Sequence, residues 1–305
     1  MKNKIYRSPL FYVGDKFKLI EEIREHFPNK INKFIEPFTG GGSVFLNIDA
    51  KEYLLNDIDK HVYQLHKYLI KQSNNPLKFL TDVENIIDDY KLSKSYKEDI
   101  VPLSLKKEWK KTYYAKFNKK GFEKLREDFN NDLKKSMLKL YILLIYGFNR
   151  MLRFNSENKY NLPVGNVDFN TNVLNALNDY FHLVDTKNII WHNSDYKKFL
   201  ASLKINKTDF VYLDPPYLIT FSEYNKLWNE QTESELLETL DALNAKGIKF
   251  AISNVTHYKD KENELFVKWS KQYNSYPIKS NYISYHDNTV KKFKEVLVTN
   301  YGTTK

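Results

Sequence analysis

The chain has 305 residues and a formal net charge of +10, and its 42% hydrophobic and 15% aromatic content is enough for one large or two ordinary domains. It contains no cysteine, which excludes disulfides, thiol nucleophiles and thiolate zinc sites, and its seven histidines show no close metal-ligand spacing. No apolar run is long enough to span a bilayer and the N-terminus shows no signal-peptide pattern, so we expect a cytoplasmic protein with no metal and no membrane partner.

The first sixty residues alternate between predicted strands and helices. A short strand is predicted over Lys33–Glu36, followed by the glycine-rich turn 37–43, a helical stretch, and a second strand over 52–55 that ends at Asp57. Glycines in such a turn let the backbone fold tightly and approach a ligand. The spacing F-x-G-x-G fits the dinucleotide fingerprint poorly, so a nucleoside without a pyrophosphate, such as S-adenosylmethionine, fits better. Alone, a turn of this kind is more often structural.

From about residue 61 to 150 the pattern changes to long, lysine-rich helical stretches, with an apolar core helix predicted over Leu138–Phe148. Between Val62 and Asp168 there are 21 Lys and Arg against 13 Asp and Glu, a surplus of +8. Aromatic residues stand between the lysine pairs, a combination that suits a phosphate backbone. The alternative is a solvated, lysine-rich helix surface that reflects the base composition of the genome. The segment-wide asymmetry favours a nucleic-acid partner.

Predicted strands return at 188–191, 210–213, 248–252 and 296–299. The sequence therefore predicts an α/β domain, formed by residues 1–61 and 169–305, that is interrupted by a basic, mainly helical insertion over residues 62–168.

Three of the predicted strands are followed by an acid, at Asp57, Asp195 and Asp214. If these strands are neighbours in one parallel sheet, the three carboxylates line a single crevice at its carboxyl edge, where open α/β sheets bind ligands.

The tetrapeptide Asp214-Pro215-Pro216-Tyr217 follows the buried strand predicted over 209–213. The two prolines end that strand, because neither can donate to a ladder. An acid and an aromatic ring are thereby held at the end of a strand. The carboxylate and backbone carbonyls can accept both hydrogens of an amino group while the tyrosine stacks on the ring that carries it. An isolated motif of this kind is also compatible with a structural turn and a solvated Asp.

The order Phe38–Gly42, basic insertion, Asp214–Tyr217 resembles that of the Dam-type amino-methyltransferases of DNA, and phage-type Dam adenine methyltransferases above all. Segments 209–225, 247–255 and 148–155 carry the resemblance, which spans most of the chain. It implies a Rossmann-like, class I S-adenosylmethionine-dependent methyltransferase sheet with an inserted, mainly helical DNA-recognition domain. It also implies a bacterial cell, or one infected by a phage, as the location.

The same resemblance implies roles at single positions. The residues expected to contact the cofactor, S-adenosylmethionine, are Tyr12, Lys16, Phe38, Gly40, Gly42, Asp57, Asp195, Tyr196 and Asp214. The expected catalytic residues are Asp214, Pro215, Pro216 and Tyr217. Asp214 and the Pro215 carbonyl would hold the two N6 hydrogens of a flipped adenine while Tyr217 stacks on the base. In one departure, Asp15 stands where bacterial members commonly have a second glycine before the lysine.

For DNA recognition the resemblance points to residues just past the predicted core helix. The expected DNA-binding residues are Phe148, Asn149, Met151, Arg153 and Pro163. Arg153 would read a guanine and Phe148 would fill space left by base displacement, with GATC as the target. Without the resemblance, the same residues are equally compatible with a surface turn that carries incidental arginines.

We therefore expect a site-specific DNA methyltransferase, acting on N6 of adenine in double-stranded DNA, as a monomer or weak dimer, with a companion restriction endonuclease as a candidate partner. Three alternatives stay open. Cytosine N4 methylation uses the same chemistry. Methyltransferases of RNA or of a protein amide share the cofactor fold, but more often have Asn before Pro-Pro. A catalytically silent DNA-binding relative would be expected to have lost Gly40, Asp57 or Asp214, all of which are present.

Overall fold

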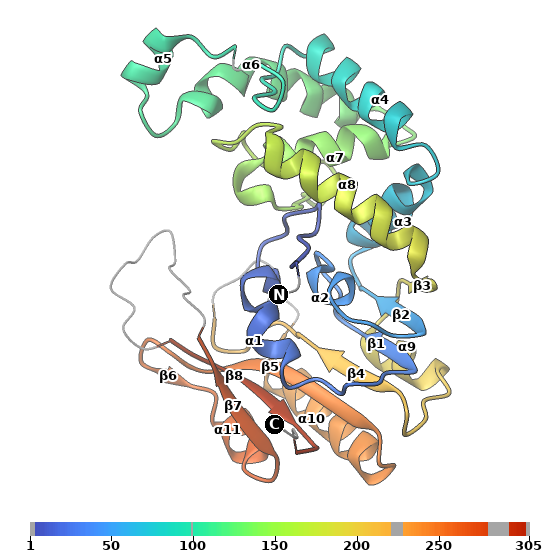
Figure 1. Ribbon diagram of the computed structural model, residues 1–305. Helices are drawn as coiled ribbons and strands as arrows, with labels where there is room; N and C mark the ends of the chain where they lie inside the picture. The colour runs from blue at the N-terminus through green and yellow to red at the C-terminus, as the bar shows by residue number, and fades with distance from the viewer. Residues whose placement is uncertain (1–3, 99, 221–227, 280–292, 303–305) are drawn as a thin grey trace. The chain divides into compact units, whose positions relative to one another are not determined.

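The computed structural model describes residues 4–98, 100–220, 228–279 and 293–302, so residues 221–225 of the Dam-like segment lie outside the described part. The chain forms two compact units (Figure 1). We call residues 16–39, 47–58 and 187–305 the sheet unit, and residues 1–15, 40–46 and 59–186 the helical unit. The predicted division at residues 62 and 168 remains a prediction, because compactness does not show which residues recognise DNA.

The sheet unit is built on a mixed sheet with the strand order β3-β2-β1-β4-β5-β8-β7, and β6 pairs with β5. Its strands are β1 Lys33–Glu36, β2 Glu52–Asn56, β3 Ile189–His192, β4 Phe210–Leu213, β5 Lys249–Tyr258, β6 Lys261–Glu262, β7 Asn274–Ile278 and β8 Phe293–Thr299. The run from β3 to β5 is parallel, whereas β8 is antiparallel to both β5 and β7. The chain reverses its direction across the sheet between β1 and β4, which is the switch point where sheets of this type bind ligands.

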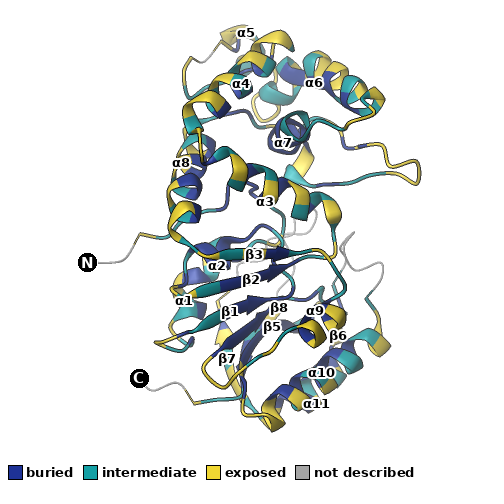
Figure 2. Ribbon diagram, turned by 90° about the vertical axis from the view of Figure 1, so that its right-hand side faces the viewer, coloured by how far each residue is buried: buried dark blue, intermediate teal, exposed yellow. Residues whose placement is uncertain are grey.

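Strands β1, β2 and β4 are buried along most of their length on both faces, as expected for the interior of a parallel sheet, whereas Ile190 of the edge strand β3 is 41% exposed. In β4, Val211 and Leu213 contribute to a core shared with three helices, while Phe210 and Tyr212 on the other face contact Phe27. The helices of this unit are η1 Lys16–Leu19, α1 Ile20–Arg24, α9 Tyr196–Ser202, α10 Glu230–Ala245 and α11 Glu264–Ser270. Figure 2 shows α9, α10 and α11 on one side of the strands and α1 on the other.

The helical unit is arranged around α7, Met137–Tyr146, in which every residue from 140 to 146 is buried. Its other helices are α2 Ser43–Leu46, α3 Lys60–Gln72, α4 Pro76–Asp89, α5 Leu103–Glu108, α6 Tyr113–Asn131, η2 Phe148–Arg150 and α8 Thr171–Thr186. Helices α3, α4 and α6 pack against α7. Phe122, one of the aromatics between the lysine pairs, is fully buried in α6 and serves this core. Trp109 is partly exposed and lies under the Lys116 ammonium, 3.7 Å from its ring centre.

The α/β prediction is confirmed, and strands appear at every predicted position within a few residues. The core helix predicted over Leu138–Phe148 is α7, one residue earlier at its start and two at its end.

Candidate active site

The tetrapeptide Asp214–Tyr217 follows β4, whose four residues are all buried. Strand β4 ends at Leu213, and the two prolines come after Asp214, so Asp214 is held at the carboxyl end of a strand next to the switch point. Its side chain keeps 19% of its surface exposed. The carboxylate is therefore fixed by the sheet and still within reach of a ligand.

Asp214 belongs to a cluster of four polar side chains, which we call the Asp214 cluster: Lys16, Asp214, Tyr217 and Glu295. The Lys16 ammonium lies 2.8 Å from Asp214 Oδ2 and 3.6 Å from Glu295 Oε1. The Tyr217 hydroxyl lies 2.9 Å from both Asp214 Oδ1 and Glu295 Oε1. The lysine also faces the tyrosine ring, 5.2 Å from its centre. Because Lys16 and Glu295 keep only 7% and 3% of their side-chain surface exposed, Asp214 is the most accessible of the three ionisable groups.

The neighbours of Asp214 shift its pKa in opposite directions. Burial raises the pKa of the Asp214 carboxyl; the Lys16 ammonium works against that shift and the Glu295 charge adds to it, so that the net pKa is above the ordinary value. A phenol carries one proton, so the Tyr217 hydroxyl donates to only one of the two carboxyl groups at a time. A hydrogen bond with the other carboxyl forms only when that carboxyl is protonated and donates to the phenol oxygen. The cluster therefore has a place for an additional proton next to Asp214.

A group of aromatic rings lies after β1 and β3 in the same unit. Phe38 is 5.2 Å from the ring of Tyr196 and 5.8 Å from the ring of Trp228, centre to centre. Trp228 donates its indole N–H to the buried Glu233 over 2.6 Å, which fixes its orientation. The phenol oxygen of Tyr196 is buried and has no hydrogen-bond partner among the residues that the structure describes. A buried polar atom of this kind is uncommon unless a ligand or water satisfies it.

Asn56, at the end of β2, ties together the loops that follow its two neighbouring strands. Its amide donates to the carbonyls of Pro37 and Ser194, both over 2.9 Å, and its oxygen accepts from the Ser194 N–H over 3.0 Å. Asp57 follows directly, and its N–H points to the carbonyl of His192 over 3.4 Å. Asn56 is therefore the residue that positions this part of the sheet edge.

The three acids do not all follow adjacent strands. Asp57 and Asp195 follow the paired strands β2 and β3, whereas β1 lies between β2 and the strand that precedes Asp214. Asp195 is also the N-cap of α9, since its carboxylate accepts from the N–H groups of Lys197 and Lys198. Its side chain therefore has a structural role that the sequence analysis did not assign.

In the helical unit, Tyr12 lies against the glycine turn. Gly40 and Gly42 have φ values of +50° and +83°, which L side chains rarely adopt. The Gly40 carbonyl is held by the buried His66 over 3.0 Å, and a β-carbon on Gly40 would stand 3.6 Å from the Tyr12 ring. Asp15, at the position where the resemblance would lead one to expect glycine, accepts from the Ser43 hydroxyl over 2.6 Å, so the carboxylate itself anchors this segment.

The five predicted DNA-binding residues lie in one stretch of the helical unit. Phe148 donates its N–H to the Pro163 carbonyl over 2.9 Å and is 38% exposed, while Asn149 is exposed with φ +53°. Arg153 is held by Asn161, whose side-chain oxygen accepts from Nε over 2.9 Å and whose carbonyl accepts from Nη2 over 3.3 Å. A guanidinium has five N–H donors, so three remain for a ligand. Met151, half-buried, lies between these residues in the chain.

Three residues of the site were missed by the sequence analysis: Glu295, Trp228 and Asn56. Glu295 had a weak signal, because it is an acid directly before the apolar residues 296–298 of β8. The contacts of all three join segments far apart in the chain, and no local pattern reports them.

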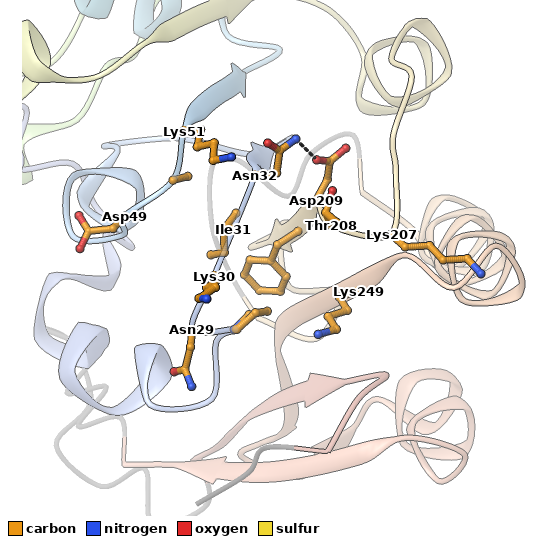
Figure 3. Close-up of a pocket in the computed structure, with 13 residues that line it drawn as sticks. Asn29, Lys30, Ile31, Asn32, Asp49, Lys51, Lys207, Thr208, Asp209 and Lys249 are labelled. Atoms are coloured by element: carbon orange, nitrogen blue, oxygen red, sulfur yellow. Dashed lines mark hydrogen bonds between the residues drawn. The ribbon is translucent and has the colours of Figure 1, made fainter.

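A hollow of about 620 Å³ lies at the amino-terminal ends of the strands, opposite the Asp214 cluster (Figure 3). Asn32 and Asp209 are joined in it by a hydrogen bond of 3.0 Å. The lysines that line it are Lys30, Lys51, Lys207 and Lys249. None of the predicted site residues lines this hollow.

Within the residues described, no group of three or more His, Cys, Asp and Glu side chains is arranged to hold a metal ion. The described part of the chain also includes no helix that is long and apolar enough to cross a membrane.

Comparisons with known proteins show which proteins this chain is similar to. The model of the D12 class N6 adenine-specific DNA methyltransferases matches residues 12–283. The type II methyltransferase M.FokI of Planomicrobium okeanokoites is 36% identical and the modification methylase StsI of Streptococcus sanguinis 34% identical, each over 98% of this chain. The chain spans only 43% and 44% of the length of these two relatives. The DNA adenine methylase of Haemophilus influenzae is 30% identical over 74% of this chain and 69% of its own length.

Proposed function

We propose a function from the family of this chain, which belongs to the D12 class N6 adenine-specific DNA methyltransferases. The chain methylates N6 of an adenine that is flipped out of double-stranded DNA, with S-adenosylmethionine as the methyl donor. The observation that carries the proposal is the Asp214 cluster, which presents one accessible carboxylate at the carboxyl end of β4.

The residues of the sheet unit fit an adenosine-containing cofactor. The buried phenol oxygen of Tyr196 has no partner within the described residues, and the rings of Phe38 and Trp228 lie beside it, so a polar group on an aromatic ligand would find both a hydrogen bond and stacking surface. Asp57 is proposed to bind ribose, in the position that Rossmann-type folds use for this purpose. When bound, the cofactor supplies an electrophilic methyl group on a sulfonium.

The residues proposed to act with it are Tyr12, Lys16, Phe38, Gly40, Gly42, Asp57, Asp195, Tyr196 and Asp214, and the positive φ values of Gly40 and Gly42 give the turn between them a backbone that few other residues adopt. Lys16 is placed here by its ion pair with Asp214, so we propose that it acts on the carboxylate as well as on the cofactor.

The chain's own part in the reaction is to hold the amino group. Each Asp214 oxygen already has one partner, Lys16 or Tyr217, and each retains a lone pair that can accept an N6 hydrogen. With the Pro215 carbonyl accepting the second hydrogen, the nitrogen lone pair would be free to attack a methyl group. Transfer would break the carbon–sulfur bond and leave a neutral thioether, and the extra proton on the methylated N6 would pass through the Asp214 carboxylate to solvent. Positioning and fixed charges supply the catalysis, and no covalent enzyme intermediate is needed.

For the target sequence we propose GATC, read by the stretch from Phe148 to Pro163. Asn161 holds one edge of the Arg153 guanidinium and leaves donors for the O6 and N7 atoms of a guanine. The exposed Phe148 ring is available to insert where a base leaves the stack. Asn149 and Met151 complete the contact surface.

The experiment measures transfer of a labelled methyl group to duplexes that contain GATC, to single-base variants of it, and to the same duplexes with the adenine replaced. The Asp214→Ala variant should lose methyl transfer while cofactor and DNA binding remain measurable. Full activity of that variant would overturn the role of Asp214. Label on cytosine would show N4 methylation, and no label on any DNA would indicate a silent DNA-binding relative.

We further propose a companion restriction endonuclease as a functional partner, because M.FokI and StsI carry the names of type II or modification enzymes. Protection of the methylated duplex against cleavage in an extract of the source cells tests this, and cleavage at the methylated sites would contradict it.

A further inference from the structure

Two arginines of the helical unit share one aromatic ring. The guanidinium carbon of Arg7 lies 4.4 Å from the ring centre of Phe11, and that of Arg150 lies 4.1 Å from the same centre. The two guanidinium groups are therefore no farther apart than these two distances together. Phe11 is buried, at 5% exposure, whereas both arginines are half-buried and reachable from solvent. Neither arginine belongs to the residues assigned above to cofactor or DNA.

The two cations lie close together in a partly buried place, where Asp15 acts on Arg7 with a compensating negative charge. Burial lowers the pKa of Arg150 to about 10, with the positive charge of Arg7 as the next contribution; Tyr141 and Asp168 act in the opposite direction. The Nε atom of Arg150 is buried without a hydrogen-bond partner among the described residues. A buried donor and a cation near a like charge both cost free energy, and cation–π contacts with one phenylalanine offset only part of it.

The backbone at this place is also strained. Phe11, Asn149 and Arg150 have φ values of +49°, +53° and +50°, and of these only asparagine adopts that region readily. Phe11 and Arg150, two left-handed residues from segments far apart in the chain, thus meet at one ring, and Asn149 precedes Arg150 directly. Strain of this kind persists where the surrounding structure holds it for a function, and it concentrates at ligand-binding sites.

We propose that Arg7 and Arg150 clamp the phosphate backbone of the DNA substrate, with Phe11 as the platform that holds both guanidinium groups. A planar guanidinium binds a phosphodiester through paired N–H groups, and the single negative charge of one phosphodiester would offset the repulsion between the two cations. A guanidinium stacked on a ring keeps its in-plane N–H groups directed outward along its edges. The proposal rests on the proposed function, because Arg150 stands in the same loop as Phe148 and Arg153.

The clamp would fix the position of the DNA backbone and would bind any base sequence equally well. Its role therefore differs from that of Arg153, which is proposed to read a base. Its two arginines come from the N-terminal segment and from η2, so a strand held by both would be registered against the loop that reads the bases. The clamp accounts for the strained backbone of residues 149 and 150, because that backbone accompanies the placement of Arg150 on Phe11. Base reading by Arg153 alone would not account for it.

The test is the salt dependence of DNA binding, measured by fluorescence anisotropy with short duplexes that contain or lack GATC. The variants are Arg7→Gln and Arg150→Gln, and the control is Lys33→Gln, a lysine of the sheet unit that pairs with Glu52 and has no proposed role in DNA binding. Each arginine variant should lower the slope of log affinity against log salt by about 0.9 for each phosphate that the protein no longer neutralises, equally on both duplexes. The control should leave the slope unchanged. An unaltered slope in both arginine variants overturns the clamp, and a weakening confined to GATC would make the arginines base readers.

A second measurement uses the wild-type protein, so it does not depend on whether the variants fold. Duplexes with one neutral methylphosphonate at each position in turn should show a loss of affinity at one or two neighbouring phosphates. At one of those positions the methylphosphonate should not weaken DNA binding by the Arg150→Gln variant any further. Such non-additivity between the substitution in the protein and that in the DNA is expected of a direct contact. If no single phosphate matters to the wild type, the clamp is wrong. If the wild type methylates no DNA, the proposed function itself fails, whatever the salt slopes show.

Discussion

Lys16 and Glu295 act on the charge of Asp214 in opposite directions. Lys16 pairs with Asp214 directly, whereas Glu295 is joined to it through the Tyr217 hydroxyl. The lysine favours the ionised form, whereas the glutamate disfavours it, and burial adds to the effect of the glutamate. Asp214 must be ionised to accept an N6 hydrogen. The activity of the chain should therefore be lost as the pH falls through the raised pKa of Asp214, and the two neighbours should decide where this acid limb lies.

Two substitutions test this with opposite signs. Glu295→Gln removes a charge that raises the pKa of Asp214, so the acid limb of kcat against pH should move to lower pH. Lys16→Met removes the charge that lowers it, so the limb should move to higher pH, in addition to any weakening of cofactor binding. DNA affinity should be unaffected by Glu295→Gln. If both variants lose activity with no displacement of the limb, these residues support the structure without setting the charge of Asp214.

The residue scale also shows what the sequence could supply about the site. The motif placed Asp214 at a strand end, and the resemblance named Lys16 and Tyr217. It assigned Tyr217 a stacking ring only, while the structure adds a hydroxyl shared between two carboxylates. Glu295 lies about eighty residues farther along the chain, on a strand that is antiparallel to β5. Such a partner is fixed by strand pairing, which no local pattern of residues contains.

At the level of elements, the glycine turn offers a matched pair of substitutions. Gly14 and Gly42 both have φ +83°, but a β-carbon on Gly14 would meet nothing within 4 Å. On Gly42 it would stand 2.5 Å from the Phe45 ring and 3.0 Å from His66. Gly14→Ala should thus cost the backbone strain alone, roughly 1–2 kcal/mol of unfolding free energy. Gly42→Ala should cost about 1–3 kcal/mol more, because packed neighbours must move.

Denaturant unfolding of both variants checks the pair, with wild type alongside. Equal losses of unfolding free energy in the two variants would mean that Phe45 and His66 move aside at no cost and that backbone strain alone sets the loss. A loss of cofactor affinity in Gly42→Ala beyond its loss of stability would support a ligand at this turn.

Elements with a strong local pattern were predictable and the others were not. The apolar β1 and β4 lie where the sequence placed them, and α7 was identified by its unbroken apolar run. The edge strand β7, Asn274–Ile278, was missed, because it is polar and carries Pro277, which only an edge position tolerates. Strand β5 extends to Tyr258 through Asn254 and Thr256, polar residues whose burial depends on pairing with β8.

Over the whole molecule, the surplus of positive charge between Val62 and Asp168 accompanies a helical unit whose core is complete without those charges. Some of these lysines hold the unit together, since Lys135 donates to the carbonyls of Phe129 and Asn130 and Lys116 lies over Trp109. Others, such as Lys119 and Lys120, are exposed and available to a polyanion. Composition predicted a basic helical segment, but it did not predict that α8, beyond that segment, joins the same compact unit. The boundaries of the compact units depend on which residues pack together, and the charge pattern of the sequence carries no information about packing.

The stability of the molecule should depend on the charge state of His66, which is buried between Gly40 and Tyr180. Burial lowers the pKa of His66 from 6.5 to about 4, so the unfolded chain binds a proton that the folded chain excludes. Unfolding free energy should therefore be unaffected by this group above pH 6.5 and should fall between pH 6.5 and 4, by on the order of 3 kcal/mol. His66→Gln should flatten that slope in denaturant unfolding at several pH values, while the exposed His182→Gln should retain it. Equal slopes for wild type and His66→Gln would show that the imidazole is protonated within the fold, in which case its bond to the Gly40 carbonyl would carry a charge.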